Sequence, residues 1–575
     1  MKVDAPPPGF EPLAGAEVFQ HGFLPAAAAY CRRLGLVELV NSMVPTRMKL
    51  KPGLAVQGML LDVLSGRSPL YHVEDFMEGQ DIELLLGEKE PASAFNDNNL
   101  GRALDAIFEA GPSRILAEFG LAAAREFSLD CSVVSYDTTS TSVWGEYRPS
   151  EFDPPAPGPV VTYGHSKDNN PDLKQFMTEL LCVERGVPIF SRTLDGNSSD
   201  KKSNNWMLSR ISGIMARHGL GAGAFVYVAD SAMVTADNLA AMGANRFVTR
   251  LPATYGECSR VVADAVASGN WIALGNLAEN FQGAGRPAAE HKVAESEVEL
   301  YGVKYRVLVV HSSSHDKRRR KKLEKQVEAS AKAIDKELSK APEKFYCRED
   351  AEAAAAAAGR LSDGIHVVKA TVIPFEARTR GRPKYGEPPK TTTRYKLAFD
   401  VSPDKNGIER LETLAGCFVL LSNVPRDGEN SMDSRKLLLT YKGQYGVESD
   451  FAFLKDPLVV NDLFLKTPSR IDALGMILVM ALTIWRLMER SMRAHVRKSG
   501  KPMKGWVNRD TTAPTAYMMS VYVTGIMVAA TRLGRIFLKR PRAKAMGFIN
   551  AMGLTEEVFT NPRFKCEPII PPRKT

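Results

Sequence analysis

Two short apolar segments, each followed at once by an aspartate, restrict the fold of this chain more than any other feature. Residues 133–136 (VVSY) lead into Asp137, and residues 224–229 (AFVYVA) lead into Asp230. Their β-branched and aromatic residues predict strands, and the helical patterns around them are typical of an α/β protein. If the two strands are parallel neighbours, their ends meet, and two carboxylates that close are tolerated only when a cation is bound.

The pattern of apolar, polar and turn residues changes along the chain and predicts five regions. In the first region, helices are expected at residues 24–40, 54–64 and 100–109, separated by turn residues. Residues 252–433 combine short strands with a charged helix and polar loops. The predicted regions are a helical N-terminal domain (1–128), the first part of an α/β core (129–251), a β-rich insertion (252–433), the second part of the core (434–498) and a helical C-terminal region (499–575).

The segment YKGQYGVESDFAFLK, residues 441–455, spaces polar side chains as one helix face would. At 100° per residue, a sector about 60° wide contains four side chains: Tyr441, Gln444, Glu448 and Lys455. An amphipathic helix with solvated charges explains this spacing by itself, and each aspartate taken alone is more often a cap of a strand end or turn. Taken together, Glu448 and the two aspartates form an oxygen-ligand set for a hard divalent ion.

Composition and charge exclude several classes of protein. The formal net charge is +9, with 75 Lys and Arg against 66 Asp and Glu, which mildly favours a polyanionic partner. Seven cysteines form no CxxC pair and no zinc-type cluster, so neither a disulfide scaffold nor a zinc site is expected. The N-terminus does not resemble a secretory signal, which predicts a cytoplasmic protein. The apolar stretch 473–485 is shorter than the roughly 20 residues of a membrane span and predicts a buried core helix.

Four further motifs accompany the segment at 441–455, and they identify a family. They are DTTS at 137–140, GHSKDNNPDLKQ at 164–175, GNSSD at 196–200 and VADSAM at 228–233. With them, the chain resembles bacterial insertion-sequence transposases of the DDE class, in particular the group with a Y-x2-R-x3-E-x6-K signature and a β-strand insertion domain. Tyr441, Glu448 and Lys455 match that signature in spacing, whereas Gln444 stands where the group has arginine.

The resemblance implies a ribonuclease-H-like core, with its acids on the first strand, the fourth strand and a late helix. In this family three catalytic acids, here Asp137, Asp230 and Glu448, hold two Mg²⁺ ions, for which Mn²⁺ can substitute. The ions support cleavage of a phosphodiester and its joining to new DNA. The implied protein is an enzyme that cuts and pastes DNA in the bacterial cytoplasm, associated with the nucleoid when bound to DNA, with no role at a membrane.

The resemblance also implies the partners. Tyr441, Gln444 and Lys455 would contact the ends of double-stranded transposon DNA, although glutamine lacks the charged, bidentate phosphate grip of arginine. The terminal inverted repeats and the target DNA would be held by a homodimer in the synaptic complex. Residues 1–128 would be a DNA-binding domain.

Two basic segments favour the same partner. Residues 317–322 (KRRRKK) are six consecutive cations, which suit phosphate contact as well as a solvated helix start. The RGRPK segment at 380–384 has the form of an AT-hook, in which Arg380 and Arg382 would enter an A·T-rich minor groove. A short RGRP segment in a Pro/Gly loop also occurs by chance.

The leading hypothesis is therefore a DDE transposase. One alternative is a DNA-binding protein that descends from such an enzyme and has lost its chemistry, an idea motivated only by Gln444. Another is a ribonuclease-H-like nuclease that cuts DNA without joining it. P-loop, GxSxG and HExxH motifs are absent from the sequence, so no other type of enzyme site competes.

Overall fold

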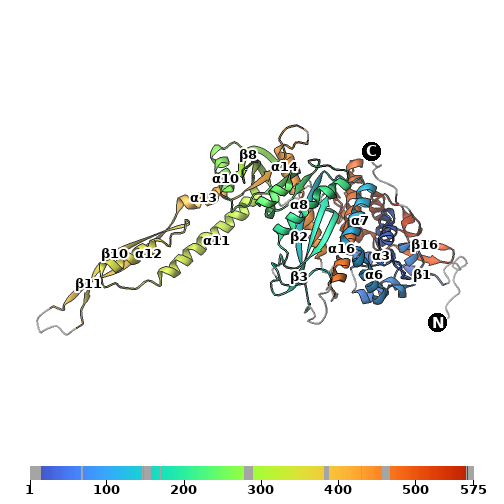
Figure 1. Ribbon diagram of the computed structural model, residues 1–575, viewed down its shortest axis with the longest axis horizontal. Coiled ribbons are helices and arrows are strands. Elements are labelled where there is room, and N and C mark those ends of the chain that lie inside the picture. Colours follow the sequence, from blue (N-terminus) through green and yellow to red (C-terminus); the bar gives the residue numbers. More distant parts are fainter. Residues whose placement is uncertain are drawn as a thin grey trace. The chain divides into compact units, whose positions relative to one another are not determined.

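The structure is a computed structural model of the chain, and two compact units make it up. It describes residues 15–66, 69–145, 147, 157–168, 170–184, 186–277, 289–380, 388–428, 430–455, 467–564 and 566. The first unit contains residues 1–249 and 422–575, and the second contains residues 250–421. Figure 1 shows the elements of both units, which are described separately below.

Helices fill the N-terminal part of the first unit, as predicted. They are α1 (Leu24–Arg33), α2 (Leu36–Met43), α3 (Pro52–Leu64), α4 (Val73–Glu78), α5 (Ile82–Leu86), α6 (Asp97–Ala110) and α7 (Pro112–Glu126). The single helix expected at 24–40 is interrupted, because Gly35 adopts a left-handed conformation (φ 61°) before α2. Every residue of α3 is buried, and α3 packs against α1, α2, α6 and a long later helix, so it forms the centre of this region.

Five strands of a large mixed sheet lie in the first unit, in the order β4-β3-β2-β5-β6. They are β2 (Val133–Val143), β3 (Lys174–Val183), β4 (Val187–Leu194), β5 (Val226–Val228) and β6 (Arg246–Arg250). Strands β2, β3 and β4 are antiparallel neighbours, whereas β2, β5 and β6 are parallel. The two aspartate-bearing strands, β2 and β5, are parallel neighbours, which is the condition under which their ends meet. Strand β2 does not end at Asp137 but continues to Val143, because β3 pairs with it along this whole length.

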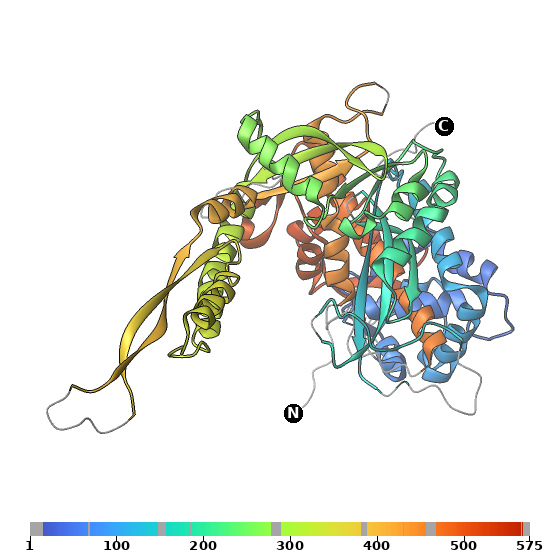
Figure 2. The ribbon, with the colours of Figure 1, turned by 60° about the vertical axis from the view of Figure 1, so that its left-hand side comes forward.

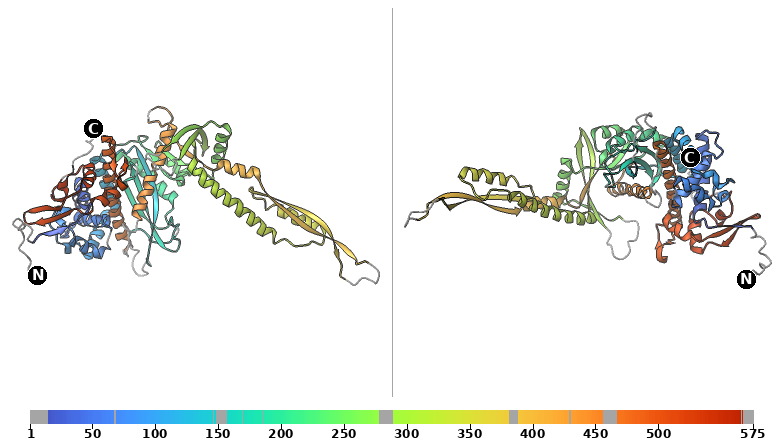
Figure 3. Two further views of the ribbon diagram at one scale, coloured as in Figure 1. Left: turned by 180° about the vertical axis from the view of Figure 1, so that it is seen from behind. Right: turned by 90° about the horizontal axis from the view of Figure 1, so that it is seen from below.

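Helices flank these strands. They are α8 (Asp200–Arg217), α9 (Ala236–Met242), α14 (Ser434–Lys442), α15 (Tyr445–Leu454) and α16 (Pro468–Ser499). Helix α15 packs against β2, and α16 lies between β4 and the N-terminal helices (Figure 3). Helix α16 is long and apolar enough to span a membrane, but 78% of its most apolar window is buried inside the protein, which agrees with the predicted core helix.

The C-terminal region was expected to be helical, but it also contains strands. It contains β13 (Met503–Lys504), β14 (Asp510–Thr511), α17 (Ala516–Val523), β15 (Met527–Thr531), β16 (Gly534–Lys539) and α18 (Ala543–Ala551). Strand β15 pairs with both β16 and the N-terminal strand β1 (Glu17–Phe19). The helical prediction failed here because these strands are short and gain their stability from pairing with a segment far away in the sequence.

The second unit is mixed rather than β-rich. Its strands β7 (Ile272–Asn276), β8 (Glu290–Leu300), β9 (Val303–Ser312) and β12 (Cys417–Ser422) lie in the order β12-β9-β8-β7. Its helices are α10 (Gly256–Ser268), α11 (Ser313–Leu338), α12 (Arg348–Gly359) and α13 (Lys405–Leu414). A separate two-stranded hairpin, β10 (His366–Arg378) with β11 (Thr391–Pro403), runs beside α12 (Figure 2). A small apolar cluster joins β10 to α11 and α12.

Candidate active site

Asp137 and Asp230 lie side by side on the central parallel strands. Strand β2 pairs with β5 so that Ser135 is opposite Val228. Continued by two residues, this register brings Asp137 level with Asp230, just after β5 ends. Asp230 caps a short 3₁₀ turn there, because its carboxylate accepts a hydrogen bond of 3.1 Å from the backbone N–H of Ala232. The structure therefore brings together two of the three predicted acids.

Lys167 and Asp200 join this pair, although neither was predicted to belong to the site. The Lys167 Nζ lies 3.2 Å from Asp200 Oδ1 and 4.0 Å from Asp137 Oδ1. The same ammonium donates hydrogen bonds to the backbone carbonyl and the hydroxyl of Thr138, each at 2.7 Å. The Thr138 hydroxyl in turn donates to Asp200 Oδ1 at 2.5 Å. The cluster thus contains three carboxylates and one ammonium.

Glycines in two of the sequence motifs fix Lys167 and Asp200 in position. A Cβ atom on Gly164 would lie 2.1 Å from the carbonyl oxygen of Gly196, and one on Gly196 would lie 1.9 Å from that of Gln175. The side-chain amide of Gln175 also donates to the carbonyl of Gly196 at 2.7 Å. Because only glycine permits so close an approach of two backbones, the loop of Lys167 and the turn before Asp200 are held against each other.

Asp137 and Asp230 both have raised pKa values, and burial is the main cause. Burial raises the pKa of Asp137 to about 7, and the charges of Asp230 and Asp200 add to this rise, while Lys167 opposes it. The pKa of Asp230 is raised too, by burial first and then by Asp200. Such an environment favours the binding of a cation, which stabilises the ionised form of both groups.

The predicted single helix at 441–455 is wrong, because α14 and α15 are separate helices. Between them the hydrogen bonds change to the tighter i→i−3 pattern, in which Gln444 N–H donates to the Tyr441 carbonyl and Val447 N–H to that of Gln444. This change turns the side chains about the helix axis. Gln444 is only 8% exposed, whereas Glu448 is exposed and Tyr441 is half-buried. Gln444 therefore does not share an exposed face with Glu448.

A buried ion pair anchors α15, the helix that carries Glu448. Asp450 is fully buried and accepts a hydrogen bond of 2.6 Å from the Arg486 guanidinium of α16. The thiol of Cys182, on β3, lies 3.5 Å from the other carboxylate oxygen. Burial raises the pKa of Asp450 to about 7, although Arg486 opposes this rise. These contacts hold α15 against α16 and β3, and α15 also packs against β2, the strand of Asp137.

The third acid is not seen to join the pair. Within the described ranges, no group of three or more His, Cys, Asp or Glu side chains is arranged to hold a metal ion. The donor chemistry of Asp137 and Asp230 nevertheless fits Mg²⁺ or Mn²⁺, which prefer carboxylate oxygens. Asp200 lies beside them as a further donor, and the positive charge that compensates all three comes from Lys167.

Lys455 of the signature pairs with a carboxylate of the Lys167 loop. Its Nζ lies 2.6 Å and 2.8 Å from the two carboxylate oxygens of Asp168. Lys455 follows α15 directly, in the C-cap position, and its side chain is 22% exposed. Lys455, one of the residues expected to contact DNA, is thus already paired with an acid.

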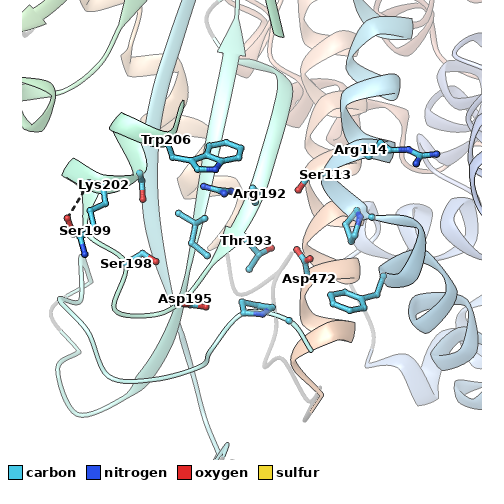
Figure 4. A pocket seen from close by; sticks show the side chains of 17 residues that line it. Ser113, Arg114, Arg192, Thr193, Asp195, Ser198, Ser199, Lys202, Trp206 and Asp472 are labelled. Carbon is cyan, nitrogen blue, oxygen red and sulfur yellow. Dashed lines mark hydrogen bonds between the residues drawn. The ribbon is translucent and has the colours of Figure 1, made fainter. Parts of the chain in front are cut away.

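A pocket of about 780 Å³ lies between α7, β4 and the start of α8 (Figure 4). The Arg192 guanidinium stacks on the Trp206 ring, 3.4 Å from its centroid, and also pairs with the buried Glu179. Arg114 and Lys202 are exposed cations of the lining. None of the three predicted acids lines this pocket, so it is a feature separate from the carboxylate cluster.

The two basic segments are only partly described. Arg380 is exposed just after β10, whereas Arg382 lies outside the described residues. Residues 317–322 fall within α11, where Lys321 and Lys322 are exposed and the side chains of 317–320 lie outside the described part. The AT-hook therefore stays a prediction.

Comparison with known proteins identifies a domain in the N-terminal helices. Residues 17–121 match a family described as a domain of unknown function, DUF4277. No curated protein matches the chain. The matched range extends from β1 into α7 and contains none of the predicted acids, so it leaves the chemistry of the carboxylate cluster to be argued from its residues.

Proposed function

We propose that this chain is a transposase that cuts and joins DNA at the ends of an insertion sequence in a divalent-metal-dependent reaction. The observation that carries the proposal is the parallel register that sets Asp137 level with Asp230. The strand order β4-β3-β2-β5-β6, with only the first three strands antiparallel, supports a ribonuclease-H-like core. In such a core the first acid lies on the first strand and the second acid follows the fourth strand. If β2 is the first strand of this core, β5 is the fourth, and Asp137 and Asp230 take these two positions.

Three acidic residues would bind the metal in this reaction, and backbone N–H groups orient two of them. Asp137 and Asp230 would hold the metal, with Glu448 as the third acid, supplied by α15. When bound, a pair of Mg²⁺ ions activates the attacking oxygen and stabilises the leaving oxygen of a phosphodiester. Backbone N–H groups orient the two aspartates, since Thr138 N–H donates to Asp137 at 2.7 Å and Ala232 N–H to Asp230 at 3.1 Å.

The DNA would approach from the side of α15 and the Lys167 loop. Lys455 and Tyr441 would contact phosphates of the transposon end, and Arg380 with Arg382 a minor groove elsewhere on the DNA. A homodimer would hold two ends together. Lys455 has to leave Asp168 to do so, and phosphate, which also carries negative charge, can replace that carboxylate.

The alternative of a binding protein without chemistry loses its main motivation. Gln444 was the only support for this alternative. Because the Gln444 side chain is only 8% exposed, its identity is explained by packing between α14 and α15 and not by the loss of a DNA contact. A nuclease without strand transfer would use the same acids, so the reaction products have to distinguish it from a transposase.

A strand-cleavage assay separates the three functions. The substrate is duplex DNA that carries the two flanks of the gene, where inverted repeats are expected, incubated with the chain and Mg²⁺. Joined products support the transposase, nicks without joining support the nuclease, and retention of uncut DNA supports the binding protein. Asp137→Ala should abolish the cutting.

A further inference from the structure

The ammonium group of Lys167 contacts the same kinds of oxygen atoms that a bound metal ion would. Its three ammonium hydrogens have three oxygen partners within 3.2 Å: the carbonyl and hydroxyl of Thr138, and a carboxylate oxygen of Asp200. The same charge also acts on Asp137 and Asp230, where it opposes the rise of both pKa values. Carbonyl, hydroxyl and carboxylate oxygens are the donors that hard metal ions also use.

The ammonium balances negative charge that the fold creates. Without Lys167, the carboxylates of Asp137, Asp200 and Asp230 would repel one another at a partly buried place. Only 27% of the Lys167 side chain is exposed, and glycine contacts fix its loop, so the lysine is built into the site. A lysine on a flexible surface loop would be free to leave at little cost.

We propose that Lys167 is the resident counter-ion of this carboxylate cluster and that a divalent metal ion displaces it. Lys167 is then a positioning residue. It keeps Asp137 and Asp230 in place while the metal is absent, and it competes with the metal for their charge. Asp200 is the residue that holds the ammonium in its resting place. This inference rests on the proposed function, because it adds an element of control to the same metal site.

The exchange requires no proton transfer. The ammonium stays protonated, breaks its hydrogen bonds with Thr138 and Asp200, and turns toward solvent or toward a DNA phosphate as the divalent ion arrives. The net charge of the cluster becomes more positive by one when one divalent ion replaces one ammonium. Closing the site on DNA phosphates then becomes more favourable.

Binding of Mn²⁺ alone to the full chain tests this proposal, with electron paramagnetic resonance of free Mn²⁺ as the readout. Lys167→Gln should bind Mn²⁺ about tenfold more tightly than the wild type, because a competing charge about 4 Å from Asp137 is removed. In metal-free buffer its unfolding temperature should fall, and saturating Mn²⁺ should raise it more than in the wild type. Lys201→Gln, an equal change of charge at an exposed position on α8, should change neither value.

Three further variants keep the test decisive. Lys167→Arg retains the charge and should bind Mn²⁺ no more tightly than the wild type. Lys167→Gln combined with Asp200→Asn removes one charge of each sign and should recover part of the lost metal-free stability. Asp137→Asn should abolish Mn²⁺ binding in every background, so that the signal of free Mn²⁺ stays undiminished, which assigns the bound ion to this cluster.

The outcomes also separate this proposal from the proposed function. Unchanged Mn²⁺ affinity in Lys167→Gln, in a chain that still cuts DNA, would overturn the counter-ion role and leave the transposase intact. Tighter Mn²⁺ binding in Lys167→Gln, in a chain that never cuts DNA, would support the counter-ion role and overturn the transposase. Absence of Mn²⁺ binding from the wild type and from Lys167→Gln would overturn the counter-ion role.

Discussion

Lys455 and Asp168 form an ion pair in which the Nζ lies 2.6 Å from one carboxylate oxygen and 2.8 Å from the other. The pair joins the end of α15, the helix of Glu448, to the loop of Lys167. Both lysines of the candidate site are therefore engaged by aspartates within the protein. DNA phosphates would have to compete with Asp168 for Lys455.

Asp168→Asn should strengthen DNA binding by releasing Lys455. We expect a gain of severalfold at low salt, and a salt dependence of the affinity steeper by about one phosphate contact. Fluorescence anisotropy of a labelled duplex, measured across a salt series, reports both quantities. Asp172→Asn provides the control, since Asp172 is an exposed aspartate of the same loop. An equal gain from both variants would show a general charge effect and remove the role of the ion pair.

Gln444→Arg should destabilise the chain rather than improve its grip on DNA. Position 444 is 8% exposed at the tight turn between α14 and α15, and a longer charged side chain there has to displace its neighbours or bury its charge. We expect a loss of about 1–3 kcal/mol in the free energy of unfolding. Thermal unfolding measures it, with Tyr445→Arg at the adjacent, 72% exposed position as the control. Tighter DNA binding with unchanged stability would contradict the buried position of Gln444.

The sequence was most informative where structure is local. The apolar runs before Asp137 and Asp230 were enough to predict two strands, and their parallel pairing is observed. The prediction that residues 441–455 share one helix face was wrong, because a short stretch of i→i−3 hydrogen bonds between α14 and α15 changes the rotation per residue. Two glycines near Gln444 permit such a stretch. Helix periodicity over 15 residues does not detect so short a change.

Lys167 and Asp200 were not predicted, although both lie within motifs that had been recognised. Their meeting depends on backbone contacts between Gly164, Gly196 and Gln175, which bring two distant loops together. The signal in the sequence was the presence of glycines and charged residues in both loops. Nothing in that pattern says which charges would face each other, because the choice is made by tertiary packing.

Arg486→Met should destabilise the fold by leaving Asp450 buried without its partner. Breaking a buried ion pair on one side costs about 3 kcal/mol or more. The pKa of Asp450 is already raised to about 7 by burial, so a proton can replace the lost guanidinium at low pH. The loss should therefore be larger at pH 8 than at pH 5.5. Thermal unfolding at both pH values checks this, and Arg470→Met, which breaks a more exposed pair with Asp105, should cost less. A loss independent of pH would contradict the account.

His218 should make the chain more stable as the pH rises from about 4 to 6.5. Burial, with the charges of Arg217 and Arg125, lowers the pKa of His218 to about 4 in the folded chain. The unfolded chain binds this proton more readily, so the contribution is complete above the unfolded pKa of about 6.5 and is lost as the pH falls toward 4. His218→Gln should flatten the pH profile of thermal unfolding in this window, by less than the full pKa shift would give, because His218 is partly exposed and solvent screens its charge. An unchanged profile in His218→Gln would contradict this role of His218.

Strand cleavage by variants that each lack one carboxylate shows whether Asp137, Asp230 and Glu448 hold a catalytic metal. Labelled duplex DNA from the flanks of the gene is incubated with wild type, Asp137→Asn, Asp230→Asn and Glu448→Gln, in Mg²⁺ or in EDTA, and with Asp472→Asn as a control acid from the separate pocket. We expect cutting and joining by the wild type and by Asp472→Asn in Mg²⁺ only. In the three other variants the rate of cutting should fall by about 100-fold or more. Cutting that survives in Asp137→Asn or Asp230→Asn, or that proceeds equally in EDTA, would contradict this metal site.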